Sequence, residues 1–181
     1  MQTREQKTSE VILVLATPDD AKELAEAMRG AELKNFAQLQ NDVTDEEERA
    51  YLKRKQDEGS LIYLVMANGR IVGTVGLHEV DMFMRIARIG VTIFHSRDRH
   101  AHYGRIAMTK LIELAFTVHG IERLEAKVVA TNQKQIAWDE SFGFVREGLA
   151  RGKYLINEQR LDMVTLGLLK TDWLEKNGGN G

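Results

Sequence analysis

The sequence contains no cysteine and a single proline among its 181 residues. Without cysteine the chain has no thiol nucleophile, no disulfide and no thiolate ligand for a metal. It also lacks any apolar run that approaches the length needed to span a bilayer. Function classes that depend on a cysteine thiol are therefore excluded.

A strong net charge is absent as well, because 25 Lys and Arg residues face 27 Asp and Glu residues, for a formal charge of −2. Such a balance gives no overall attraction to nucleic acid or to an anionic membrane, and we expect neither as a partner. Residues Met1 to Glu10 are polar and carry no apolar segment of the kind found in signal peptides. We expect a soluble, cytoplasmic protein.

The length and the 43% hydrophobic content are sufficient for one well-buried core. We expect a single domain over residues 11–175. A polar N-terminal tail over residues 1–10 precedes it, and a flexible, glycine-rich C-terminal tail over residues 176–181 follows it.

The first third of the chain predicts one strand and two helices. The β-branched run Val11–Leu15 is typical of a buried strand, and a helix is expected from about Pro18 to Arg29. Thr44 and Glu47 have the spacing of a capping box, which predicts the start of a second helix. Residues 32–42 between the helices are expected to be irregular or to form a short helix, and such a segment often borders the substrate in small enzymes.

A period of two replaces the helical period from Leu61 onward. Leu61–Ala67 and Arg70–Glu79 are β-rich runs, and Asn68-Gly69 between them suits a two-residue hairpin turn. Arg85–Phe94 continues the pattern after a connection at Asp81–Met84. The sequence therefore predicts three consecutive antiparallel strands.

A crossover follows these strands. The run from Gly104 to Gly120 has the apolar spacing of a helix, and Leu124–Val129 is the next strand, so the strands on either side of the helix should be parallel neighbours. The remaining elements are expected to be a short helix at Asn132–Phe142, a strand from Phe144, a turn at Asn157-Glu158 and a last strand at Arg160–Leu169.

A basic loop from His95 to Tyr103 joins the third of the antiparallel strands to the crossover helix. The first N–H groups of a helix have no internal partner and carry partial positive charge, so anions bind there. Two other interpretations remain open: a basic loop that is merely solvated, and a His-x-His metal site, which has no carboxylate or cysteine nearby to complete it.

The order of elements, with a basic loop before the central helix, resembles the GNAT superfamily of acyl-CoA-dependent N-acyltransferases, and within it the ribosomal-protein alanine N-acetyltransferases. The local matches are Ile71–His78, Ala87–Gly90, Asn132–Phe144, and Glu147-Gly148 followed by Lys153-Tyr154 and Asp162–Leu169. The resemblance implies an α+β fold with a mixed, mainly antiparallel sheet of about six to seven strands and about four helices, splayed between strands 4 and 5.

The resemblance also implies acetyl-CoA as co-substrate. The family's phosphate loop matches Arg99–Gly104, with His100 and His102 at positions where relatives carry glycine. The cofactor-binding residues implied are Arg99, His100, His102, Tyr103, Gly104 and Arg105 at the phosphates, and Val91, Thr92, Ile93 and Asn132 along the pantetheine arm. Asn132 equally suits a helix N-cap, and both roles can hold at once.

The chemistry implied is direct attack of an amine on a thioester, which requires a base, an oxyanion donor and an acid. The implied oxyanion donor is a backbone N–H in the Gly90–Phe94 region, at Thr92 or Ile93 in first place. Glu79 and His78 are the candidate bases, although a solvated strand end and a buried histidine are common outcomes for such residues. Asp139 occupies the position at which many relatives have a tyrosine that serves as the acid. An aspartate is a useful acid there only if burial raises its pKa. Ser141 is the alternative donor.

The acceptor implied is a primary amine: a protein N-terminus, a polyamine, an amino sugar or a drug. Its expected cleft is lined by Leu33–Leu39, the turn at Glu79–Met84 and the hairpin near Tyr154–Gln159. The competing hypothesis is a catalytically impaired relative that serves as a binding or regulatory module, suggested by the altered loop, the missing tyrosine and Arg88 at a position where relatives often carry glutamate. No metal is expected, and a homodimer is common in the family.

Overall fold

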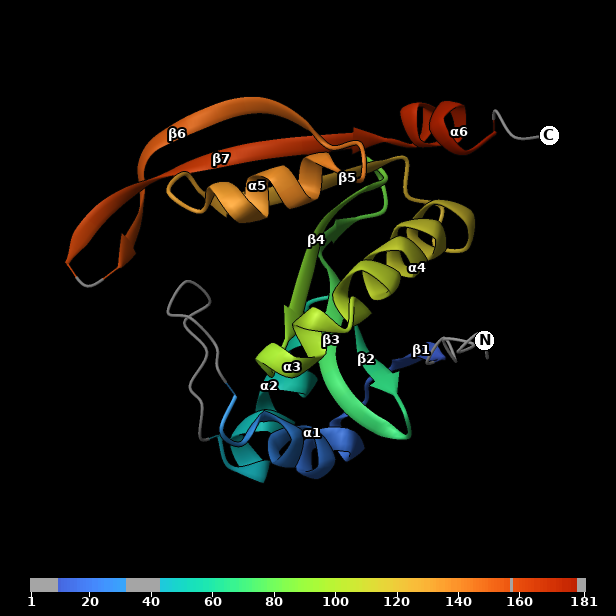
Figure 1. Ribbon diagram of the computed structural model, residues 1–181, viewed down its shortest axis with the longest axis vertical. Coiled ribbons are helices and arrows are strands. Elements are labelled where there is room, and N and C mark those ends of the chain that lie inside the picture. Colours follow the sequence, from blue (N-terminus) through green and yellow to red (C-terminus); the bar gives the residue numbers. More distant parts are fainter. Residues whose placement is uncertain (1–9, 32–42, 157, 179–181) are drawn as a thin grey trace, which may run out of the picture.

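The computed structural model describes residues 10–31, 43–156 and 158–178, and one seven-stranded sheet runs through it in the order β1-β2-β3-β4-β5-β7-β6 (Figure 1). The strands are β1 (Val11–Leu15), β2 (Leu61–Ala67), β3 (Arg70–Asp81), β4 (Ile86–Ile93), β5 (Arg123–Val129), β6 (Val145–Ile156) and β7 (Gln159–Leu169). The helices are α1 (Ala21–Met28), α2 (Asp45–Asp57), α3 (Ser96–His100), α4 (Tyr103–Thr117), α5 (Gln133–Glu140) and α6 (Lys170–Gly178), with a 3₁₀ turn η1 (Pro18–Asp20). The α+β class and the mainly antiparallel sheet are confirmed.

The sheet opens between β4 and β5, the one parallel pair in the order above. These strands pair only where Ile86–Arg88 lies beside Arg123–Glu125. The other edge of β4 stays paired with β3 as far as Ile93. From Ile89 onward the edge of β4 that faces β5 therefore has no strand beside it, and Figure 1 shows the two strands diverging. The predicted splay between strands 4 and 5 is confirmed.

Helices cover both faces of the β2–β3 region and divide the core in two. On β2, Tyr63 and Val65 belong to the larger cluster, which contains α4, whereas Ile62 and Leu64 belong to a smaller cluster with α1 and α2. Alternate side chains of a strand point to opposite faces, so the two clusters lie on opposite sides of the sheet. None of the described helices has both the length and the apolar character required to cross a membrane.

Local sequence signals are confirmed at the predicted positions. The Glu47 N–H donates to Thr44 Oγ1 at 3.2 Å and the Thr44 N–H donates to the Glu47 carboxylate at 2.9 Å, which completes the capping box of α2. Asn68 and Gly69 both have positive φ, of 52° and 73°, as a tight hairpin turn requires.

The structure adds three features to the predicted elements. A short helix, α3, lies within the basic loop, and α6 follows β7, so the predicted C-terminal tail begins inside a helix. Strand β3 continues to Asp81 through an irregularity at Glu79, which has φ of 50°. Some predictions fall outside the described residues, which exclude 1–9, 32–42, 157 and 179–181. These predictions are parts of both tails, the segment between the first two helices, and the turn at Asn157.

Candidate active site

A cavity of about 840 Å³ lies where β4 and β5 separate. Strand β4 contributes Arg88 to Thr92 and β5 contributes Ala126 to Val129. Helix α5 contributes Gln135 and Asp139, and Asn132 lies just before it. Helix α2 contributes Glu47, Glu48, Tyr51, Leu52, Arg54 and Lys55. The cavity therefore joins the face of the sheet under α2 to the gap beside α5.

His78 lies over a floor made of two glycines. In the β3–β4 register His78 is opposite Arg88, and Gly76 is opposite Gly90. A Cβ added at Gly76 or Gly90 would lie 3.0 or 3.1 Å from His78 Nε2, so a side chain at either position would crowd the imidazole. Its Nδ1 is buried without a hydrogen-bond partner among the described residues. Burial, aided by the charges of Arg88 and Lys55, lowers the pKa of His78 to about 4, so the cavity contains a neutral imidazole.

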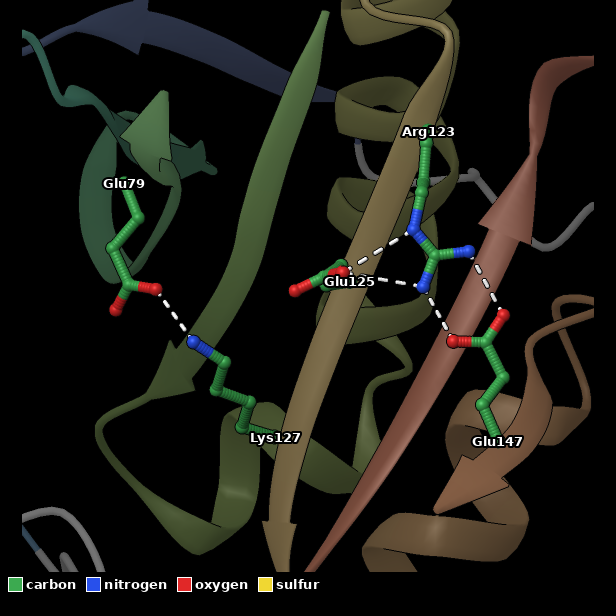
Figure 2. A network of polar contacts seen from close by, with 5 residues as sticks. All are labelled: Glu79, Arg123, Glu125, Lys127 and Glu147. Carbon is green, nitrogen blue, oxygen red and sulfur yellow. Dashed lines mark hydrogen bonds and ion pairs between the residues drawn. The ribbon is translucent and has the colours of Figure 1, made fainter. Parts of the chain in front are cut away.

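Glu79 is not among the residues that line the cavity, and its carboxylate belongs to an ion-pair network. Its carboxylate accepts hydrogen bonds from Lys127 Nζ at 2.6 Å and from Arg88 Nε at 2.8 Å. Figure 2 shows the Lys127 ammonium directed at Glu79. The hydrogen bond from Lys127, with that from Arg88, lowers the pKa of Glu79 to about 2. This carboxylate ties β3 to β4 and β5, and it is too weak a base to suit proton removal at neutral pH.

Asp139 is a buried acid. The residue is 2% exposed, it lines the cavity from α5, and its Oδ1 accepts a hydrogen bond from Gln135 Nε2 at 2.9 Å. Burial raises the pKa of Asp139 from 3.8 to about 6. The sequence analysis required a raised pKa for Asp139 to be a useful acid, and the burial of this side chain provides it.

Ser141 and Asn132 have different positions at the two ends of α5. Ser141 does not line the cavity; its Oγ donates to the carbonyl of Trp138 at 2.6 Å and accepts from Arg105 Nη2 at 2.8 Å. Asn132 lines the cavity and its side chain accepts from the Gln135 N–H at 3.3 Å. Asn132 thus caps the helix and faces the cavity at the same time.

The start of α4 lies against the end of β4. A Cβ at Gly104 would lie 3.2 Å from Ile93 Cγ1, so glycine allows this close approach. His102, the residue immediately before α4, adopts a left-handed conformation with φ of 61°. Glycine adopts this conformation more readily than a residue with a side chain. No side chain caps α4, and its first N–H groups have no partner within the helix.

Several side chains of the basic loop contact the protein itself. Arg99 Nη1 donates to the carbonyl of Ile93 at 2.8 Å, and the buried hydroxyl of Tyr103 accepts from Asn68 Nδ2 at 2.9 Å. The guanidinium of Arg105 lies 4.7 Å from the centre of the Phe142 ring. His100 and His102 are exposed. These contacts fix the loop beside the α4 N-terminus, outside the cavity lining.

A second ion-pair network fixes β5 to the outer hairpin. Arg123 donates to Glu125 Oε1 at 3.2 Å and to both carboxylate oxygens of Glu147 on β6 (Figure 2). A side chain at Gly167, on β7 between them, would collide with Glu147, so glycine there makes room for this network. The strands that border the gap on this side are thereby held together.

The sequence analysis missed Glu48, Tyr51, Lys127 and Gln135 as residues around the cavity. A signal existed for Glu48, because it lies four residues before the buried Leu52 and so shares its face of α2. No local pattern marks Lys127, whose partner Glu79 is 48 residues away in the chain.

Comparisons with known proteins agree with this geometry. A family model described as an acetyltransferase (GNAT) domain matches residues 13–165. The putative ribosomal N-acetyltransferase YdaF of Bacillus subtilis (strain 168) is 31% identical over 125 residues, which are 69% of this chain and 66% of that protein. The uncharacterized N-acetyltransferase p20 of Bacillus licheniformis is 29% identical over 114 residues, 61% of each chain. The chain therefore matches somewhat less than two thirds of the length of these curated relatives.

Solved structures show the same fold. The crystal structure of a probable acetyltransferase has a TM-score of 0.78 and 26% identity, covering 92% of this chain and 97% of that one. A spermidine N-acetyltransferase SpeG chimera from Vibrio cholerae and hSSAT has a TM-score of 0.79 over 92% of this chain and 99% of its own. Its identity is 20%, so that likeness concerns the fold alone.

Proposed function

Because the chain belongs to the GNAT acetyltransferase family, we propose that it transfers an acetyl group from acetyl-CoA to a primary amine by direct attack on the thioester. The observation that carries this proposal is the cavity at the β4–β5 gap, which is lined on one side by an unpaired strand edge and on the other by Asn132 and Asp139.

The residues around the gap fit acetyl-CoA. The free edge of β4 at Val91 and Thr92 offers backbone donors and acceptors to an extended amide-bearing arm, as a neighbouring strand would. The Asn132 side chain faces the same space from α5. The α4 N-terminus, brought close to β4 at Gly104, supplies N–H groups for phosphate.

Asp139 is proposed as the general acid. Acetyl-CoA, when bound, supplies an acetyl group activated as a thioester, and its transfer to the amine releases the coenzyme thiol. With a pKa of about 6, Asp139 is protonated in about one molecule in ten at pH 7. Since a thiol has a pKa of about 8.5, movement of the Asp139 proton to a thiolate is downhill.

His78 is proposed to orient the amine. His78 lines the cavity, and its Nδ1, which is buried without a partner among the described residues, can accept a hydrogen bond from an N–H group. Because its pKa is about 4, holding a proton at pH 7 would cost about 4 kcal/mol, so His78 serves as a hydrogen-bond acceptor, and the proton of the amine leaves to water. Backbone N–H groups near Thr92 are proposed as the oxyanion donors.

The test is calorimetric titration with acetyl-CoA, combined with an assay for amine-dependent thiol release. Asn132→Ala should weaken acetyl-CoA binding, and so should Asn132→Ser, which keeps a helix-capping hydroxyl but lacks the reach of the amide. A cap-only role for Asn132 predicts that serine preserves binding. Absence of both heat and thiol release in the unaltered protein would refute the proposed function.

A further inference from the structure

Helix α2 directs an unpartnered carboxylate into the cavity. Glu48 is 5% exposed and lines the cavity. No hydrogen bond or ion pair reaches its carboxylate from any residue in the described ranges, although its neighbours along the helix are engaged in several. Burial alone raises its pKa, with no nearby cation to counter that effect.

A buried carboxylate without a partner destabilises the fold, because the charge has lost its hydration without gaining a counter-charge or a hydrogen bond. The other carboxylates around the cavity have partners: Glu47 has Thr44, Glu58 has Lys55, Glu79 has Arg88 and Lys127, and Asp139 has Gln135. Glu48 is therefore the carboxylate in the described lining that is ready to receive a cation or a hydrogen-bond donor from outside the chain.

The basic side chains of the cavity lie elsewhere and are already paired. Lys55 is two turns beyond Glu48 on α2, about 10 Å along the helix axis, and its Nζ lies 2.7 Å from Glu58. Arg88 and Lys127 share Glu79 on the sheet. In the described lining, Glu48 is thus the carboxylate without a hydrogen-bond partner, whereas Lys55, Arg88 and Lys127 are each already ion-paired.

We infer that Glu48 binds the ammonium group of the acceptor, and that the acceptor presents a single positive charge to this cavity rather than the several charges of a polyamine. A first ammonium group would neutralise Glu48. A second one, further along the molecule, would meet the basic side chains Lys55, Arg88 and Lys127 without finding a free carboxylate. The inference rests on the proposed acetyl transfer, but the binding measurements that test it do not require catalysis.

The test compares Glu48→Gln with Glu46→Gln, a matched change at an exposed position of the same helix. The probes are n-butylammonium, n-butanol and spermidine at equal ionic strength, with binding followed by NMR titration and by the shift in melting temperature. We expect n-butylammonium to bind the unaltered protein and Glu46→Gln, and to bind Glu48→Gln about tenfold or more weakly. Butanol should not distinguish the variants, and spermidine should bind no better than n-butylammonium.

A kinetic arm uses acetyl-CoA and n-butylamine. Glu48→Gln should raise the acceptor KM by about tenfold or more while the calorimetric Kd for acetyl-CoA is unchanged. The unliganded Glu48→Gln protein should melt no lower than the unaltered one, because a buried charge has been removed. Should glutamine prevent folding, Glu48→Asp keeps the charge and shortens its reach, and it should give an intermediate loss of amine binding.

The outcomes separate the two proposals. Equal amine binding by Glu48→Gln and the unaltered protein, no amine binding at all, or tighter binding of spermidine would each overturn the inference about Glu48. Glu48-dependent amine binding without acetyl-CoA binding or thiol release would refute the proposed transferase function and leave the ammonium site standing.

Discussion

At the level of single residues, burial acts on two titratable side chains of the cavity in opposite directions. It raises the pKa of Asp139 to about 6 and lowers that of His78 to about 4. Both shifts favour the neutral form, which is the expected response of an acid and a base to a poorly solvated site. The cavity therefore disfavours charge of either sign, and a charged acceptor needs a specific counter-charge within it.

Replacement of Asp139 by Asn should lower kcat by about a hundredfold, because the amide cannot supply the proton that the departing thiolate requires. The KM for acetyl-CoA should change little. In the unaltered enzyme kcat should fall as pH rises through about 6, because Asp139 loses its proton there. The variant should not show this fall. Steady-state thiol release across pH measures both effects, and an unchanged kcat would exclude Asp139 as the acid.

The same substitution should stabilise the fold at high pH. The pKa of Asp139 is raised from 3.8 to about 6, so the folded state binds the proton more tightly than the unfolded state. Stability therefore falls as pH rises from about 4 to about 6, and above that the penalty is on the order of 3 kcal/mol. Asp139→Asn should raise the melting temperature at about pH 8 and not at about pH 3. Calorimetry measures this, with Glu140→Gln, a partly exposed neighbour that is ion-paired with Arg146, as the control that should show no comparable gain.

At the level of elements, the loop before α4 carries backbone strain at His102, whose φ is 61°. His102→Gly should stabilise the protein by up to about 1 kcal/mol in urea unfolding, because glycine adopts this conformation freely. His100→Gly, within α3, should instead destabilise it. If both variants lose stability equally, His102 makes compensating contacts and the strain argument fails.

The Glu79 network should act as a tie between strands and have little part in catalysis. Glu79→Gln should cost at most about 1 kcal/mol at low salt, since the side chain is 56% exposed, and the loss should shrink at high salt. Because the pKa of Glu79 is lowered to about 2, its contribution is complete above its ordinary value of 4.5 and is lost as pH falls towards 2. Melting curves at two salt concentrations check this, with kcat expected within a few-fold of the unaltered enzyme. A large fall in kcat would restore Glu79 as a base.

The elements that sequence could predict are those set by neighbouring residues. The Thr44–Glu47 capping box, the Asn68-Gly69 turn and the parallel neighbours on either side of α4 follow from local chemistry and from the handedness of crossovers. Helix α3 could not be predicted in this way, because Ser96–His100 is polar and too short to show an apolar period.

The site depends more on contacts that are distant in sequence. The pKa of Asp139 and the exclusion of Glu79 from the cavity both depend on partners and burial that only the folded sheet provides. Glu48 reads as one of four acidic residues that begin α2, and its burial follows from the packing of α2 on the sheet. Sequence could locate the strand edge and Asn132, but not the protonation states around them.

At the level of the whole molecule, the two parts of the sheet are joined by the short parallel pairing of Ile86–Arg88 with Arg123–Glu125. Acetyl-CoA bound in the gap should therefore slow hydrogen exchange at β4 from Ile89 onward, where the strand edge is free in its absence. Exchange at β2, which is paired on both edges already, should change little. Exchange measured with and without acetyl-CoA checks this, and equal protection of β2 and β4 would indicate general stabilisation instead.

The division of the core into two clusters also bears on how such a protein diversifies. The smaller cluster, formed by α1 and α2 with one face of β2, contains the packing that positions Glu48, whereas α4, α5 and the strands beside the gap belong to the larger one. Substitutions in the smaller cluster can thus accumulate with little disturbance of the machinery for the coenzyme. Under the proposed function, the amine acceptor could change in this way while the binding of acetyl-CoA is retained.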